Sequence, residues 1–89
     1  MRLHVVVRGR VQRVGFRWFV QAEARSLDLA GWVRNTTDGS VEVEAEGEQA
    51  SVQKLRGALV RGPDGAHVES VDDMASGGDQ LARPFRIVR

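Results

Sequence analysis

The spacing of apolar and polar residues follows two periods, and each period predicts one type of element. Leu3–Arg8 alternates between the two kinds and is rich in β-branched residues, which predicts a strand. From Phe16 the apolar residues recur at helical spacing, which predicts a helix over Phe16–Leu27. Trp32–Asn35 returns to the strand pattern. The first third of the chain is therefore expected to form a strand, a helix and a second strand.

The same two periods recur in the rest of the chain. Ser40–Glu46 alternates valine and alanine with three glutamates, which predicts a half-buried strand whose glutamates face solvent. An Asp-Gly pair before it is typical of a hairpin turn. The remaining predicted elements are an amphipathic helix over Glu48–Arg61 with acidic residues in its first turn, a strand over His67–Met74 and a short strand over Phe85–Val88.

This order of elements, β-α-β-β-α-β with a short final strand, predicts an α+β fold. Two helices on one face of an antiparallel sheet satisfy it, as in the ferredoxin-like βαββαβ sandwich. A chain of 89 residues is too short for two separate cores, so we expect a single domain over residues 1–89. The longest aliphatic run is Val5–Val7, so we expect neither a transmembrane helix nor a signal peptide.

Composition narrows the possible functions. The chain has no cysteine, which excludes a disulfide scaffold, thiolate metal sites and thiol nucleophiles and favours a reducing compartment, so we expect the cytoplasm. The net charge of +1 is unevenly distributed. Residues 1–34 carry seven arginines and two acidic residues, whereas residues 35–79 carry ten acidic residues and three basic ones. The charge pattern therefore directs attention to the N-terminal third.

The segment between the first strand and the first helix is the most unusual one. Glycines bound this loop, Gly9–Gly15, and Arg17 falls in the first turn of the helix that follows. N–H groups at a helix N-terminus lack intrahelical partners, and glycines let several of them converge on one anion. An arginine there can bind two phosphate oxygens at once. The pattern favours a phosphate cradle, and an ordinary turn with a solvated arginine stays open as the alternative.

Several segments together resemble the acylphosphatases, at that family's spacing and over essentially the whole chain. They are GRVQRVGFR (9–17), GWVRN (31–35), DGSVEVEAEG (38–47), GPDGAHVESV (62–71) and the terminal FRI (85–87). The resemblance implies the βαββαβ sandwich and the hydrolysis of acyl phosphates by water, with no metal and no cofactor. The implied partner is a small acyl phosphate, with no nucleic acid and no membrane, and we expect a monomer.

The resemblance also implies the roles of particular residues. Arg17 matches the phosphate-binding arginine, and Asn35 matches the asparagine that orients the attacking water; both would be catalytic. The implied phosphate-binding residues are Gly9, Val11, Gln12, Arg13, Val14, Gly15, Phe16 and Arg17. The expected donors are the backbone N–H groups from Arg13 through Arg17.

The chain departs from the family pattern at two positions. Arg13 stands where the family usually has glycine; if φ is positive there, a side chain costs on the order of 1 kcal/mol. Its charge could tighten phosphate binding and slow phosphate release. Asp28 stands where a glycine commonly ends the first helix, and aspartate tolerates a left-handed backbone better than most residues. Only the first departure bears on the catalytic rate.

The residues available suit this reaction. The leaving group of an acyl phosphate is a carboxylate, which needs no general acid, so the lack of an obvious acid–base pair is expected. The loose transition state requires positioning and electrostatic stabilisation. His4 and His67 have no partner at metal-ligand spacing and are interpreted as structural residues. Trp18 and Trp32 are expected to pack or to line the rim of a pocket.

Two other functions are compatible with parts of the sequence. One is a phosphate-binding module whose turnover Arg13 has impaired. The other is single-stranded RNA binding on the sheet, which requires aromatic residues on the central strands. The chain has no tyrosine, and Phe16, Trp18 and Phe19 fall in the predicted helix, so the sequence disfavours RNA binding.

Overall fold

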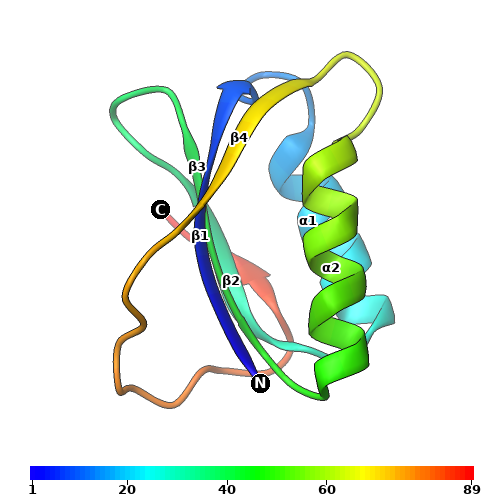
Figure 1. The fold of residues 1–89 in the computed structure, drawn as a ribbon, viewed down its shortest axis with the longest axis vertical. Coiled ribbons are helices and arrows are strands. Elements are labelled where there is room, and N and C mark those ends of the chain that lie inside the picture. The colour runs from blue at the N-terminus through cyan, green and yellow to red at the C-terminus, as the bar shows by residue number, and fades with distance from the viewer.

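A five-stranded sheet carries both helices on one of its faces in the computed structural model, which describes residues 1–89 (Figure 1). The elements are β1 (Arg2–Arg10), α1 (Phe16–Ser26), β2 (Ala30–Asn35), β3 (Val41–Glu46), α2 (Gln49–Arg61), β4 (His67–Asp73) and β5 (Arg86–Ile87). The strand order is β4-β1-β3-β2-β5. The ferredoxin-like α+β fold is thus confirmed. The first four strands pair antiparallel, and β5 adds to the edge of β2 in parallel, so the sheet is mixed.

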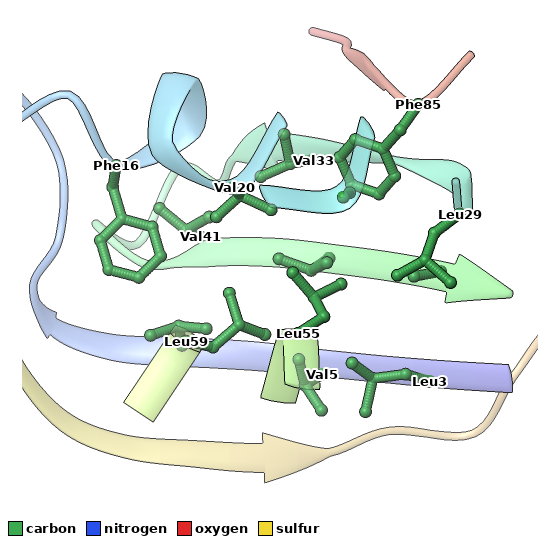
Figure 2. Close-up of a cluster of buried hydrophobic side chains, with 14 of the residues drawn as sticks. Leu3, Val5, Phe16, Val20, Leu29, Val33, Val41, Leu55, Leu59 and Phe85 are labelled. Atoms are coloured by element: carbon green, nitrogen blue, oxygen red, sulfur yellow. The ribbon is translucent and has the colours of Figure 1, made fainter. Parts of the chain in front are cut away.

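The core lies between the sheet and the two helices. Alternate residues of the strands point toward the helices, as the period-two pattern requires, and meet one face of each helix. Figure 2 shows these side chains meeting between the layers, with Phe16 at one end and Phe85 close to Val33. The fully buried members with the largest side chains are Phe16, Phe85, Leu55, Leu59, Val5, Val7, Val11, Val20, Val33, Val41, Val43 and Val52. No helix is long and apolar enough to cross a membrane.

The first strand is longer than predicted. β1 continues through Arg10, and its pairing with β4 shifts register between Arg8 and Gly9. Gly9 has φ 126°, and a Cβ there would stand 2.1 Å from the carbonyl oxygen of His67. Glycine is therefore required by the close approach of two strands. The connection to α1 is the shorter loop Val11–Gly15, so the predicted start of the loop at Gly9 was wrong.

The second helix also differs from expectation in one respect. α2 begins at Gln49, and Glu48 is its N-cap residue, with an extended backbone (φ −63°, ψ 145°). The first turn consequently holds no acidic residue. The predicted acidic first turn was wrong by one position, because the apolar period does not distinguish a cap residue from the first helical one.

The sheet face away from the helices is less exposed than the sequence predicted. Glu44 is only 6% exposed and the side chain of Glu42 only 13%, so the expectation that all three glutamates of β3 face solvent was wrong for these two. In the antiparallel register His4 of β1 and Trp32 of β2 flank Glu44 on either side. The segment that follows β4 crosses the same face (orange in Figure 1). The expectation that both tryptophans pack or line the rim of a pocket holds for half-buried Trp32, which lines a cavity, but not for Trp18, which is 70% exposed.

His4 connects this crossing segment to the sheet through both of its ring nitrogens. Nε2 lies 2.6 Å from Oε2 of Glu42, and Nδ1 lies 2.7 Å from the carbonyl oxygen of Ala75. Both partners are acceptors, so both nitrogens carry a proton only in the imidazolium form. Burial lowers the pKa of His4, but the hydrogen bonds to Glu42 and Ala75 and the charges of Glu44 and Glu42 outweigh it and raise the pKa above 6.5.

This raised pKa predicts a pH-dependent stability. The pKa is higher in the folded than in the unfolded chain, so the contribution of His4 is complete below about pH 6.5 and is lost as pH rises through the folded pKa. We expect the midpoint of urea unfolding to fall over that interval. In His4→Gln this fall should disappear, whereas His67→Gln, which alters an exposed histidine, should retain it. An identical pH profile for wild type and His4→Gln would contradict the assignment.

Candidate active site

The loop Val11–Gly15 has the backbone conformation of an anion-binding nest. Arg13 has φ 64° and Gly15 has φ 75°, and Val14 between them has negative φ. Alternation of left-handed and right-handed residues turns successive N–H groups toward one side. A Cβ on Gly15 would meet nothing within 4 Å, so its left-handed backbone alone accounts for the glycine. Arg13 shares that conformation without being glycine.

The N–H groups of this loop have no partners in the protein. The first bond of α1 runs from the N–H of Phe19 to the carbonyl of Gly15, at 3.0 Å. The N–H groups of residues 12–15 donate to no protein acceptor. Those of residues 16–18 have no carbonyl four positions earlier within the helix. The end of β1 and the start of α1 together therefore present a run of free donors at the positive end of a helix dipole.

Apolar side chains anchor the loop Val11–Gly15 and the start of α1 to the core. Val11 and Phe16 are each 1% exposed and belong to the core, and half-buried Val14 packs against it. Figure 2 shows the Phe16 ring pointing from the start of α1 toward Leu59 of α2. These residues can therefore contribute to a ligand site through their backbone only. Their burial keeps the loop in one conformation without using any of its N–H groups.

Gln12 connects the loop to the turn between β2 and β3. Its Nε2 donates to the carbonyl of Thr36 at 2.9 Å and to that of Ser40 at 2.8 Å. Both amide hydrogens are thus used to hold the turn that begins directly after Asn35. From the sequence Gln12 was expected to contact the phosphate, and its structural role could not be recognised there. Figure 1 shows the start of α1 and this turn at the same end of the sheet.

The turn itself is stabilised by its own side chains. Asp38 accepts hydrogen bonds from the hydroxyls of Thr36 and Ser40 and from the backbone N–H of Ser40, the last at 3.1 Å. Arg8 reaches the same carboxylate at 3.2 Å. The hydrogen bonds from Ser40 and Thr36 hold the pKa of Asp38 well below its usual range. Asn35 is therefore followed by a turn with a fixed shape.

Arg17 and Asn35 are two half-buried polar side chains that no other group of the protein engages. Arg17 lies half-buried in the first turn of α1 and forms no hydrogen bond or ion pair. By contrast, Arg34 pairs with Glu42 at 2.7 Å. Half-buried Asn35 is the last residue of β2, and its side chain has no hydrogen bond within the protein. It lines an open cleft of about 300 Å³ with Arg34, Thr36, Thr37 and Arg89.

The structure gives the predicted site residues different positions and partners. The backbone of residues 11–15 and the start of α1 form one continuous surface of donors, to which Gln12 attaches the turn after Asn35. Gly9 lies apart from these donors in the β1–β4 ladder, where the close approach of the strands explains it. Arg13 is exposed and unpaired and adds its charge beside the loop. The free backbone donors at a helix N-terminus suit a small anion such as phosphate.

Known proteins resemble this chain along nearly its whole length. A family model described as acylphosphatase matches residues 3–87. An acylphosphatase from Salinibacter ruber is 46% identical over 88 residues, which is 99% of this chain and 93% of that protein. One from Acaryochloris marina is 48% identical over 88 residues, or 98% of this chain and 92% of that protein. The crystal structure of acylphosphatase from Bacillus subtilis superimposes with a TM-score of 0.86 at 38% identity, covering 99% and 98% of the two chains.

Proposed function

Because the chain belongs to the acylphosphatase family, we propose that it hydrolyses small acyl phosphates to a carboxylate and inorganic phosphate. Water is the nucleophile, and the site comprises the loop Val11–Gly15, the start of α1, Arg17 and Asn35. One observation carries this assignment of the site. A run of free N–H groups at a helix N-terminus lies next to an arginine that has no partner in the protein.

The cradle acts on the phosphoryl group. The N–H groups from Arg13 through Arg17 donate to its oxygens, and the helix dipole adds positive potential. The guanidinium of Arg17 provides two parallel donors to two of these oxygens, which a lysine cannot do. Charge is spread over these oxygens in a loose transition state. Donors that are already in place therefore stabilise the transition state without reorganisation.

Asn35 acts on the water. Its amide can accept a hydrogen bond from the water and donate one to it, and it stays neutral in doing so. A carboxylate at the same position would repel the approaching anion. Gln12 keeps the turn after Asn35 attached to the cradle loop, so water and phosphorus are held in a constant relation.

The leaving group places few demands on the protein. A carboxylate departs without protonation, because the pKa of its conjugate acid is about 4 and lies well below neutral pH. We propose that no metal and no cofactor take part. We also propose that the protein works as a monomer in the cytoplasm, since the cradle and Asn35 belong to one chain and no residue is a cysteine.

The proposed activity is tested with benzoyl phosphate as substrate. Release of benzoate is followed in the presence of a chelator, and inorganic phosphate is added as an inhibitor. We expect turnover that the chelator leaves unchanged and competitive inhibition by phosphate. The proposal fails if the wild-type protein does not hydrolyse benzoyl phosphate. Loss of turnover on chelation alone would refute the metal-free mechanism.

Gln12→Met is expected to separate positioning from substrate binding. It removes two hydrogen bonds of about 1 kcal/mol each, so the free energy of unfolding should fall by about 2 kcal/mol. The turn after Asn35 loosens, and we expect kcat to fall by about tenfold while the inhibition constant of phosphate changes little. Gln21→Met, which removes a single bond from the N–H of Ile87 far from the loop, is the matched control and should keep kcat. A selective rise in the phosphate inhibition constant would instead make Gln12 a phosphate ligand.

Arg13→Gly tests the alternative of a phosphate-binding module with impaired turnover. The left-handed backbone at Arg13 costs about 1–2 kcal/mol, which glycine avoids. Glycine in turn loses about 0.5–1 kcal/mol more chain entropy on folding. The free energy of unfolding should therefore rise by up to about 1 kcal/mol. We expect KM to rise a few-fold at low salt as one cationic charge disappears. Hydrolysis that is absent in wild type and present in Arg13→Gly would favour the alternative. A lower urea midpoint in Arg13→Gly would contradict the strain argument.

A further inference from the structure

The segment between β4 and β5 borders an open cavity on the sheet face opposite the helices. Residues 74–85, named here the strap, cross that face as the orange segment of Figure 1. Arg2 donates to the carbonyls of Gly77 and Asp79. The N–H of Gly31 donates to the carbonyl of Ala82 at 2.9 Å, and His4 contacts Ala75. The strap is therefore held along its length, and the space of about 410 Å³ beneath it is a lasting feature.

Glu44 lines this cavity and lacks a partner. It is 6% exposed, its Oε2 is buried without a hydrogen bond, and its carboxylate accepts none from any residue. The neighbouring cationic side chains bind other groups. His4 and Arg34 both bind Glu42, and the terminal nitrogens of Arg2 bind the strap and Glu46, while Nε of Arg2 is buried without a hydrogen-bond partner. A buried carboxylate without a donor is costly, which indicates that this group is built to receive one.

The other residues that line the cavity limit the kind of ligand that can bind beside Glu44. Arg86 of β5 also lines the cavity and is exposed, with no hydrogen bond or ion pair of its own. Trp32, Leu81 and Val88 provide apolar surface in the lining, and Trp32 lies between Glu44 and Arg86 in the strand register. Asp79 stands at the exposed strap and adds negative charge on the outer side. Small-molecule sites typically have this volume, a mainly apolar wall and a few polar groups of fixed position.

We propose that the cavity binds a free α-amino acid with an uncharged apolar side chain. The ammonium group donates to the Glu44 carboxylate, the carboxylate accepts from the Arg86 guanidinium, and the side chain lies against Trp32 and Leu81. An amino acid presents opposite charges on adjacent atoms with an apolar group beside them, which matches these three kinds of lining. A simple anion would be repelled by Glu44, and a simple cation would leave Arg86 without a partner.

The test is a titration followed by ¹H–¹⁵N spectra of the whole protein. L-Leucine and L-phenylalanine are added up to about 10 mM, a range in which a site with two charge-assisted contacts should saturate. We expect saturable shifts of the Trp32 indole N–H and of the amides of Gly31 and Gly77. The amides of Gly15 and Arg17 should stay in place, whereas inorganic phosphate should shift these and the other amides of the cradle and leave Gly31 and Gly77 in place. Binding and hydrolysis are thus observed at different residues, and either can fail alone.

Matched ligands and variants identify the contacts. N-acetyl-L-leucine lacks the ammonium group, and isoamylamine lacks the carboxylate; each should bind about tenfold more weakly or not at all. Glu44→Gln keeps the shape of the side chain and should weaken L-leucine binding to the same degree. Arg86→Gln changes an exposed residue and provides the same test if Glu44→Gln does not fold. The proposal is overturned if neither amino acid shifts the cavity resonances, or if affinity survives both substitutions.

Discussion

Arg17→Ala is expected to lower kcat/KM for benzoyl phosphate by about a thousandfold or more, since a single preorganised donor to a transition state is already worth two to three orders of magnitude. Arg17 offers two such donors together with a full charge. Because the guanidinium has no hydrogen bond or ion pair within the protein, its removal should leave the free energy of unfolding nearly unchanged. The loss should therefore appear in activity and in phosphate inhibition, and the urea midpoint should remain close to that of wild type.

Two further variants separate geometry from charge. Arg17→Lys keeps the charge without the planar pair of donors, so most of the loss should persist. Arg10→Ala removes an equal charge from an exposed residue of β1 close to the loop, and only a small, salt-sensitive rise in KM is expected. An Arg17→Ala protein that retains wild-type turnover would remove this residue from the mechanism. Comparable losses of kcat/KM in Arg10→Ala would show that the positive potential around the loop, and not the paired donors of the Arg17 guanidinium, accounts for the loss in Arg17→Ala.

Asn35→Ala is expected to reduce kcat by on the order of a hundredfold while the inhibition constant of phosphate stays within a few-fold of wild type. The cradle that binds phosphate is intact in this variant, and only the group beside the water is lost. The amide side chain has no partner in the protein, so stability should change little. Initial rates with benzoyl phosphate and inhibition by inorganic phosphate measure the two quantities separately.

The neighbouring positions provide the controls for Asn35. Thr37→Ala alters an exposed side chain of the same turn that makes no hydrogen bond, and we expect wild-type kcat. Asn35→Asp has nearly the same shape and adds a negative charge, so it should also weaken phosphate binding. If Asn35→Ala lost phosphate affinity and kcat in parallel, Asn35 would be a phosphate ligand and another group would have to orient the water.

Most of the fold could be predicted from the sequence because its elements have clear periods. The valines of β1 and β3 alternate, and the apolar positions of α1 and α2 recur at helical spacing, so type and order were both correct. Errors fell at the ends, where period carries little information. Gly9 belongs to β1 because a neighbouring strand approaches it closely, and that contact involves His67, nearly sixty residues away.

The candidate site likewise has features that depend on neighbouring residues and features that depend on distant ones. The nest at residues 11–15 and the free donors at the start of α1 depend on backbone conformations that neighbouring residues impose, so the sequence could point to an anion cradle there, with an ordinary turn as the alternative. The position of Arg17 in the first helical turn is local in the same sense. The family resemblance then gave that cradle a substrate class, and the match over residues 3–87 places the chain in the family.

Only the tertiary structure decided which of these groups remain free and which are used to hold the molecule together. The side-chain amide of Gln12 donates hydrogen bonds to a turn more than twenty residues away in the chain, and Glu44 is buried beneath the strap that follows β4. Side-chain partnerships of this kind depend on how distant segments pack, whereas periods and glycine positions report on neighbours in the chain. The sequence therefore determined where free backbone donors converge, and packing determined which side chains remain without partners.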